Sequence, residues 1–413
     1  MSFPFLVNII ALLFSFFVVG AILGALFSKS VREKLVKFLH LERLERLLLV
    51  KSIHNPILKP GTTPWTAEAV LNPAAAVLGN RTHLIYRAIG MDGVSRLGYA
   101  SSGDGIVFDK RLPYPVYVAQ KPRSLPGHAM HRLTPRHPVE GSGEDKRYSP
   151  ILYPSGGSWG GCEDPRMVVI EGRVYVTFNM FDGWDYIRVA AISIAEEDFM
   201  AEQFWKWDGP HLLSRPGELH KNWVLFPEKI NGKYAILHSI VPEVEIAYRD
   251  SIEDIGLTEP FIKSWVGSRN DLPERENAWD SFVRGAGPPP VKTEHGWLLF
   301  YHAIDKRDPG RYKLGAMLLD IHDPTKILNR SVAPVLSPDE HYENHGKPGI
   351  VYACGAVVRP STALGTSEET LFIYYGGADK VVCVATAPLH AFLDALVSGS
   401  QPTFTTMTPA QTA

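Results

Sequence analysis

The sequence predicts an all-β protein with a separate apolar segment at its N-terminus. Its 413 residues include 35 Gly and 32 Pro, and they also include 9 Trp, 16 Tyr and 19 Phe. Aromatic and β-branched runs between frequent turns are typical of β architectures rather than helical ones. The apolar content of 45% and charged content of 21% are those of a well-packed globular protein.

Charge and cysteine content exclude several classes of protein. The formal net charge of −2 gives no indication of a nucleic-acid partner. Cys162, Cys354 and Cys383 are the three cysteines, and they form no C-x-x-C pair, so neither a disulfide framework nor a zinc site is indicated. No cluster with metal-ligand spacing is visible, and we therefore expect a site without a metal or cofactor.

The N-terminal residues predict a membrane anchor. Residues 3–27 are apolar except for Asn8 and Ser15, a length that crosses a bilayer core of about 30 Å as a helix. Basic residues follow the segment and none precedes it, which places the larger C-terminal part in the cytoplasm by the positive-inside rule. The alternative is a secreted or outward-facing protein in which this segment is a signal anchor or a cleaved signal.

The remaining chain divides by composition. We expect the anchor over 1–28, a basic amphipathic helix on the membrane surface over 29–51, a proline-containing linker over 52–66, a catalytic domain over 67–399 and a disordered tail over 400–413.

Within the catalytic domain, a short apolar strand that ends in a polar cluster recurs five times. These strands are residues 83–87, 174–179, 234–238, 297–302 and 371–379, and each is followed by a second alternating strand. A strand unit repeated five times predicts a five-bladed β-propeller. The polar ends of the strands, Arg87, Asn179, His238, His302 and Asp379, would then meet at one mouth.

One short stretch concentrates charge at a strand entrance. Residues 160–166 read Gly-Gly-Cys-Glu-Asp-Pro-Arg, and an apolar run follows at once. Two carboxylates and a guanidinium in four residues are costly to bury without partners, which indicates a functional site. The alternative is an ordinary turn in which Arg166 pairs with Glu163 or Asp164.

Ten motifs, in order, resemble those of one enzyme family. They are Asn72-Pro73 and residues 86–88, 101–105, 162–166, 225–234, 285–290, 296–302, 312–316, 354–356 and 374–379. Over residues 72–393 the chain resembles glycoside hydrolase family 130, five-bladed propeller enzymes that hydrolyse or phosphorolyse β-mannosides. The resemblance therefore implies a β-mannoside oligosaccharide or glycoconjugate as substrate.

The resemblance also implies roles for individual residues. Asp164 corresponds to the family's general acid, which protonates the leaving oxygen through a sugar hydroxyl and leads to inversion. We expect Glu163 to raise the pKa of Asp164 and Arg166 to fix its orientation. The sugar-binding residues of the family correspond to Asn72, Arg87, Asp104 and Asp379. Glu163, Arg166, His238, His302 and Tyr312 complete the expected substrate contacts.

The nucleophile is the point on which this chain departs from the family's phosphorylases. Of the phosphate-binding groups, Lys221, Asn222, His302 and Tyr312 are retained, but Ser239 and Val283 stand where cations are expected. Arg284 is one position off, and on a regular strand it would point to the opposite face.

The loss of two cations favours hydrolysis by water. Glu228 and Asp280 are the candidate catalytic bases, and Glu243 and Glu245 are the next candidates. A β-mannosyl phosphorylase that uses inorganic phosphate is the alternative. A non-catalytic glycan-binding propeller is the second alternative.

Overall fold

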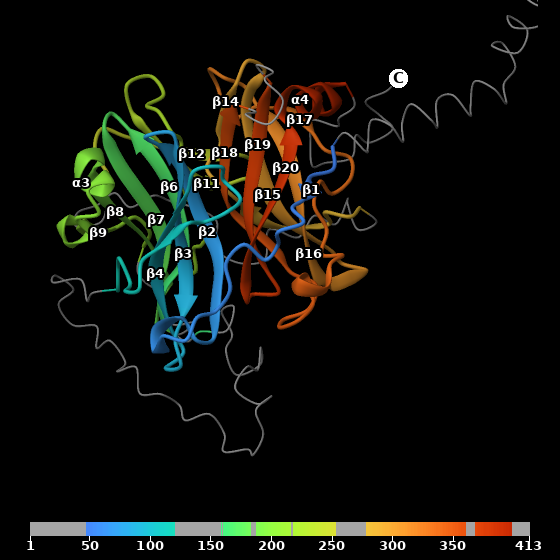
Figure 1. The fold of residues 1–413 in the computed structure, drawn as a ribbon. Coiled ribbons are helices and arrows are strands. Elements are labelled where there is room, and N and C mark those ends of the chain that lie inside the picture. Colours follow the sequence, from blue (N-terminus) through green and yellow to red (C-terminus); the bar gives the residue numbers. More distant parts are fainter. Residues whose placement is uncertain are drawn as a thin grey trace, which may run out of the picture. The chain divides into compact units, whose positions relative to one another are not determined.

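The computed structural model describes residues 47–119, 158, 160–182, 187–215, 218–252, 278–360 and 368–398. Strands dominate these residues, so the all-β prediction is confirmed (Figure 1). The few helices are short: α3 (Glu196–Met200), α4 (Leu389–Val397) and the 3-10 turns η1 (Pro64–Thr66), η3 (Phe204–Lys206) and η6 (His341–Glu343).

The strands form four sheets, and the largest sheet divides into two halves, so that five groups follow one another along the chain. The first is β2 (Ala69–Leu78), β3 (Arg81–Ile89), β4 (Val94–Ser102) and β5 (Lys110–Arg111). The second is β6 (Gly160–Ile170), β7 (Arg173–Asp182), β8 (Ile187–Ala195) and β9 (Asp208–Leu212), and a short parallel pairing of β4 with β6 joins it to the first. The third is β10 (Val224–Leu225), β11 (Tyr234–Ser239) and β12 (Glu245–Arg249).

The last two groups complete the sheet topology. The fourth is β13 (Phe282–Ala286), β14 (Val291–Thr293), β15 (Gly296–Asp305), β16 (Asp308–Leu319) and β17 (Ile327–Arg330). The fifth is β18 (Val351–Pro360), β19 (Glu369–Gly377), β20 (Val381–Pro388) and β1 (Val50–Lys51). All neighbours within a group are antiparallel, as expected for strands joined by short turns.

Strand β1 joins the two ends of the described chain. Val50 pairs with Thr386 and Lys51 with Ala385, so the first strand lies on the edge of the last sheet. Lys51 Nζ lies 2.6 Å from the buried carboxylate of Glu343, which also accepts a hydrogen bond from Tyr375. An ion pair with one buried partner holds this strand in place, because breaking it would leave a buried charge uncompensated.

The structure contradicts the membrane placement predicted from the sequence. The expected spanning segment, 3–27, and the expected tail over 400–413 lie outside the described residues. Where the description overlaps the expected amphipathic helix, Val50 and Lys51 form a strand instead. Over the described ranges no helix has the length and apolar character needed to cross a bilayer, and the longest of them is α4, with 9 residues. The described residues thus do not bear out the single-pass placement.

The core lies between the sheets and is rich in aromatic side chains. Strand β15 is buried along its whole length, and its Trp297 packs edge-on against Phe226 with ring centroids 5.1 Å apart. Burial of such a side chain contributes about 1.5–3 kcal/mol. Clusters of buried apolar side chains pack between the strand groups and hold the strand ends, and with them the polar side chains, in place.

A β-bulge interrupts the first strand of four groups, always within or next to one of the family-like motifs. The register shifts at Asn72-Pro73 in β2, at Asp164-Pro165 in β6, at Arg284 in β13 and at Cys354 in β18. A bulge adds a residue to one strand and turns its side chain away from the regular alternation. These bulges are the local features that aim the site residues.

Candidate active site

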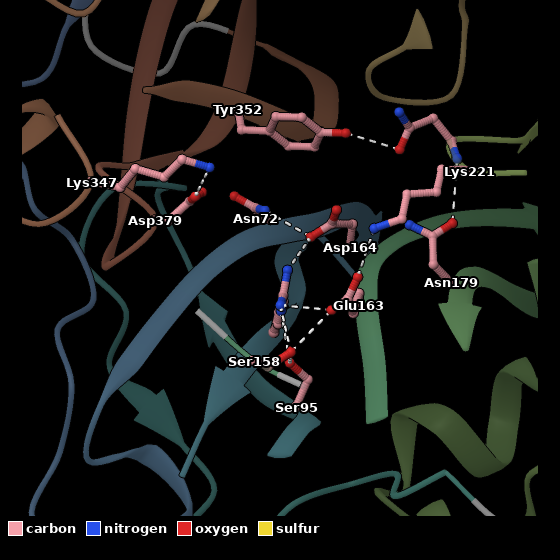
Figure 2. Close-up of polar contacts among 12 residues, drawn as sticks. Asn72, Ser95, Ser158, Glu163, Asp164, Asn179, Lys221, Lys347, Tyr352 and Asp379 are labelled. Atoms are coloured by element: carbon pink, nitrogen blue, oxygen red, sulfur yellow. Dashed lines mark hydrogen bonds and ion pairs between the residues drawn. The ribbon is translucent and has the colours of Figure 1, made fainter. Parts of the chain in front are cut away.

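Asp164 is the centre of a buried polar cluster (Figure 2). Its backbone is left-handed, with φ of 50°, and its side chain is almost fully buried. Oδ1 accepts hydrogen bonds from Asn72 Nδ2 at 2.7 Å and from Arg87 Nη1 at 3.1 Å. A non-glycine residue in this conformation at a bulge is strained, which is typical of functional positions.

The cations around Asp164 hold it in the charged form. Burial raises the pKa of this carboxyl, but Arg87, Arg166, Lys221 and the hydrogen bond from Asn72 outweigh burial and lower the pKa to about 2. The pKa of Asp164 is therefore lowered overall, although Glu163 as its neighbour was expected to raise it. The physical reason is that Arg87 and Lys221 also neutralise the charge of Glu163.

Glu163 connects two cations instead of facing a ligand. Its Oε1 accepts from Arg87 Nη2 and from Ser158 Oγ, both at 3.0 Å, and its Oε2 accepts from Lys221 Nζ at 3.0 Å. Its side chain has no exposure to solvent. Arg87 is held further by Ser95, whose Oγ accepts from Nε at 2.8 Å. Glu163 thus positions Arg87 and Lys221, and it is a supporting residue rather than the substrate contact that we expected.

Arg166 is directed toward the third and fourth strand groups. Nη1 donates to the main-chain oxygen of Asp164 at 2.7 Å, Nε to Gly287 O at 3.2 Å and Nη2 to Asn222 Oδ1 at 2.9 Å. The simple turn with an Arg166–carboxylate pair is not what forms. Asn222 has a left-handed backbone, with φ of 65°, and its Oδ1 also accepts from the Tyr352 hydroxyl at 2.9 Å.

His302 is buried and neutral beside this network. Its ring stacks on Tyr352 with centroids 3.9 Å apart, and its Nε2 accepts from the Ala353 N–H at 2.9 Å. Burial, and next the charge of Arg166, lower the pKa of His302 to about 3. Because Nε2 is an acceptor, the proton of the neutral ring is on Nδ1. Within the described residues Nδ1 is buried without a hydrogen-bond partner, so it is an available donor.

Arg284 occupies the bulge in β13 and does not point away from the site. Val283 pairs with Ala303 and Gly285 with His302, which leaves Arg284 as the extra residue. Its guanidinium lies 5.7 Å from the centre of the Tyr312 ring and 5.2 Å from that of Phe282. The expectation of the opposite face assumed regular alternation, which the bulge removes. Arg284 therefore lies with Tyr312, and its charge acts on His302.

The structure places several predicted site residues outside this cluster. Asp104 caps a turn, where its Oδ1 accepts from the N–H groups of Ile106 and Val107 at 2.8 Å. That turn follows Ser102, seven residues along β4 from Ser95, a separation of about 23 Å on an extended strand. A sugar-binding role for Asp104 next to Asp164 is therefore wrong, because the motif folds into the turn at the far end of the strand.

Neither candidate base lies with Asp164. Asp280 forms a buried ion pair with Arg330 and accepts from the Tyr301 hydroxyl at 2.9 Å. Tyr301 and His302 are successive residues of β15, so Asp280 lies on the other face of that strand. Glu228 is on the surface and pairs with Lys292 Nζ at 2.6 Å. Lys292 pairs in turn with Trp297, five residues and about 16 Å along β15 from His302.

The two remaining predicted residues have partners of their own. His238 packs against Trp223 with ring centroids 5.6 Å apart, and its Nδ1 lies 3.5 Å from a carboxylate oxygen of Glu245. Burial, followed by the charges of His220 and Arg249, lowers its pKa to about 4. Asp379 is buried and lies 3.3 Å from Lys347 Nζ.

Four residues of the cluster escaped the sequence analysis: Ser95, Ser158, Lys347 and Tyr352. None is part of a motif with a chemical signature, since isolated serines, lysines and tyrosines are common on strands and loops. Tyr352 had one available signal, because it immediately precedes the bulge residues of the Ala353–Gly355 segment. Over the described ranges, no three or more His, Cys, Asp or Glu side chains are arranged to hold a metal ion.

Comparison with known proteins identifies the class and then the family. A family model described as Glyco_hydro_130, beta-1,4-mannooligosaccharide phosphorylase, matches residues 141–397. The chain is 35% identical over 339 residues to a 1,2-beta-oligomannan phosphorylase of Thermoanaerobacter sp. strain X514, which covers 80% of this chain and 94% of that protein. It is 30% identical over 352 residues to a beta-1,2-mannobiose phosphorylase of the same strain, covering 82% and 96%.

A solved structure agrees with the fold. The beta-1,2-mannobiose phosphorylase of Listeria innocua, in complex with beta-1,2-mannobiose, superposes with a TM-score of 0.60 at 21% identity over 85% of this chain and 99% of that one. This protein is thus an enzyme of the glycoside hydrolase or glycoside phosphorylase type. The chain belongs to glycoside hydrolase family 130. The relatives named here are phosphorylases, so they favour phosphorolysis over the hydrolysis that the sequence argument put first.

Proposed function

We propose that this protein is an inverting β-mannoside phosphorylase. It transfers a mannosyl residue from a β-mannoside to inorganic phosphate and releases mannose 1-phosphate. The observation that carries the proposal is the position of Arg284. The bulge in β13 brings its guanidinium against Tyr312, where it supplies a cation that the strand pattern appeared to lack.

The proposed phosphate site contains three cations. Arg166 donates to Asn222, Lys221 is the residue before Asn222, and the charge of Arg284 acts on His302. A dianion needs several such charge-assisted donors. The unpaired Nδ1–H of His302 provides a further donor. Ser239 does not replace the expected cation, since its hydroxyl donates to Val241 O at 3.0 Å. Arg284 takes over the role that the resemblance assigned to the position of Val283.

Asp164 is the proposed general acid. Its pKa of about 2 leaves it ionised in the ligand-free site at neutral pH. A phosphate dianion bound to Lys221 and Arg166 offsets the two cations and raises this pKa, so that Asp164 can hold a proton in the ternary complex. The proton then passes through a sugar hydroxyl to the leaving oxygen while a phosphate oxygen attacks the anomeric carbon from the opposite face.

The reaction balances without a base carboxylate. Hydrogen phosphate forms the new bond to the anomeric carbon, the aglycone oxygen receives the proton of Asp164, and the proton of the phosphate ester returns to the carboxylate. This agrees with the positions of Glu228 and Asp280, which are engaged elsewhere. Asn72, Arg87 and Asp379 are the proposed sugar contacts.

For the fold we propose a closed five-bladed β-propeller. Five antiparallel groups follow one another in the chain, and β1 completes the sheet formed by β18, β19 and β20. An N-terminal strand in the last blade is a known means of closing a ring of blades, since it ties the ends together. The four bulges would then face a common axis.

Turnover of defined mannobioses with the full chain tests the proposal. Because the two curated relatives are named for β-1,2-linked substrates, β-1,2-mannobiose is the first substrate and β-1,4-mannobiose the second. We expect mannose 1-phosphate only when phosphate is present. Release of mannose at the same rate without phosphate would show that water is the nucleophile. Binding of mannobiose without turnover would indicate the glycan-binding alternative.

A further inference from the structure

Lys347, which belongs to none of the sequence motifs, forms an ion pair with Asp379, one of the proposed sugar contacts. Its Nζ lies 3.3 Å from Oδ2 of Asp379, and Figure 2 shows this pair with Asn72 and Asp164. We propose that Lys347 is a further specificity-determining residue, which donates a hydrogen bond to a hydroxyl of the transferred mannosyl residue beside Asp379, the sugar contact that the family resemblance implies. This inference rests on the proposed function.

The backbone brings Lys347 to Asp379 by close contact. The Lys347 N–H donates to Ala378 O at 2.9 Å, and Gly346 before it has φ of 142°. A Cβ on Gly346 would lie 2.7 Å from that same oxygen, so only glycine permits the approach. Ala378 and Asp379 are both left-handed, with φ of 52° and 51°. The Lys380 N–H donates to Gly377 O at 2.9 Å, so these two residues form the hairpin turn between β19 and β20, which presents Asp379 to Lys347.

Asp379 belongs electrostatically to the Asp164 cluster. Burial lowers the pKa of Arg87, but the charges of Glu163, Asp164 and Asp379 raise it overall. Arg87 in turn donates to Asp164. Asn72, which donates to Asp164, is packed against Gly376, three residues before Asp379. A ligand hydroxyl on Asp379 would therefore lie close to the proposed acid.

The pair has hydrogen-bonding capacity left for a ligand. At 3.3 Å it is longer than the 2.7–2.9 Å typical of a charge-assisted hydrogen bond. An ammonium group has three donors and a carboxylate about four acceptor positions, so both groups can bind hydroxyls while they remain paired. A neutral sugar is bound better by such a pair than by a lone buried carboxylate, because the charge of a lone carboxylate would need compensation. The side chain of Lys347 is one-third exposed, so it can reach a ligand without prior unfolding.

The test compares the full-length Lys347→Gln enzyme with the wild type on β-1,2-mannobiose and on analogues that lack single hydroxyls of the non-reducing mannosyl residue. We expect KM for mannobiose to rise about tenfold or more and KM for phosphate to stay the same. We also expect the wild type to discriminate against one deoxy analogue by about tenfold to 100-fold, and the variant to lose that discrimination. If Lys347 were purely structural, the Lys347→Gln substitution would weaken the binding of all these substrates alike.

Control variants keep the test decisive. Lys206→Gln removes a surface ion pair with Asp198, of 2.6 Å, and should leave all constants unchanged. Lys347→Arg retains the charge and should keep part of the mannobiose affinity that Lys347→Gln loses. It provides the comparison if Lys347→Gln folds poorly. Unchanged KM and unchanged discrimination in Lys347→Gln would overturn the proposal. If the wild type forms no mannose 1-phosphate, the proposed function fails, and calorimetric binding of mannobiose to both proteins still decides the role of Lys347.

Discussion

Asn72 and Asp164 are joined by a 2.7 Å hydrogen bond although 92 residues separate them. Each occupies a β-bulge in the first strand of its group, and each has a left-handed backbone. Two strained bulges thus meet at one contact, which fixes the carboxylate of the proposed acid. The packing that permits this contact comes from a third strand, because Asn72 lies directly against Gly376 of β19.

Replacing Gly376 with alanine should therefore disturb the proposed acid, Asp164, indirectly through Asn72. A Cβ at this position would collide with Asn72 Oδ1, so the side chain or the strand must move. We expect a loss of about 1–3 kcal/mol in the free energy of unfolding and a fall in kcat of tenfold or more. Chemical denaturation and initial rates measure the two effects. Gly103→Ala, whose Cβ would meet only the tip of Arg81 at 3.7 Å, should behave like the wild type.

Asp164→Asn should abolish most of the chemistry while the protein still binds sugar. The amide retains the size of the carboxyl but cannot deliver a proton, and general acid catalysis typically contributes about 10²–10⁴-fold. We expect kcat to fall by that factor, with KM for phosphate less affected. Asp198→Asn, on the surface helix α3, is the matched control. A variant at Asp164 with full activity would remove the central assignment.

Arg284→Met should separate phosphorolysis from hydrolysis. Loss of one charged donor costs about 1.5–3 kcal/mol, so KM for phosphate should rise tenfold to 100-fold while KM for mannobiose changes little. Initial rates over a phosphate titration provide the measurement, and Arg173→Met, which removes a long surface ion pair with Asp208, is the control. An unaltered phosphate dependence would show that the bulge does not contribute to the phosphate site.

The buried neutral His302 should make the fold sensitive to mild acid. In the unfolded chain this histidine takes up a proton near its usual pKa of 6.5, whereas the folded state resists protonation until about 3. The stabilisation is thus complete above about pH 6.5 and is lost as pH falls toward 3. The slope for one such group is about 1.4 kcal/mol per pH unit.

Denaturation of His302→Asn between about pH 6.5 and 5 tests this sensitivity. Asp164 stays ionised in both states over that range, since its unfolded pKa is about 3.9. We expect a shallower pH slope for the variant than for the wild type. The exposed His295→Asn protein should retain the wild-type slope. Identical slopes for all three proteins would argue against a neutral His302.

Much of the fold and part of the site could be predicted from the sequence. Strand content and the five repeated strand pairs follow from periodicity and turn residues, which are local properties of the chain. The roles proposed for Asp164, Arg87 and Asn72 come from the family resemblance of the motifs that contain them. The same reasoning failed at Val50–Lys51, where helical spacing predicted a helix. Pairing with β20, more than 300 residues away, determines a strand there instead.

The tertiary structure alone decided how these residues act together. A bulge is a relation between two paired strands, so the spacing of β13 could not show that Arg284 turns toward Tyr312. Asp280 and Glu228 carry the right chemistry, but their partners Arg330 and Lys292 hold them on other faces. The lowered pKa of Asp164 reverses the sequence expectation because it sums charges that fold in from β3, β6 and the segment before β10. Electrostatics depends on distance in space, whereas the sequence shows only the near neighbours Glu163 and Arg166.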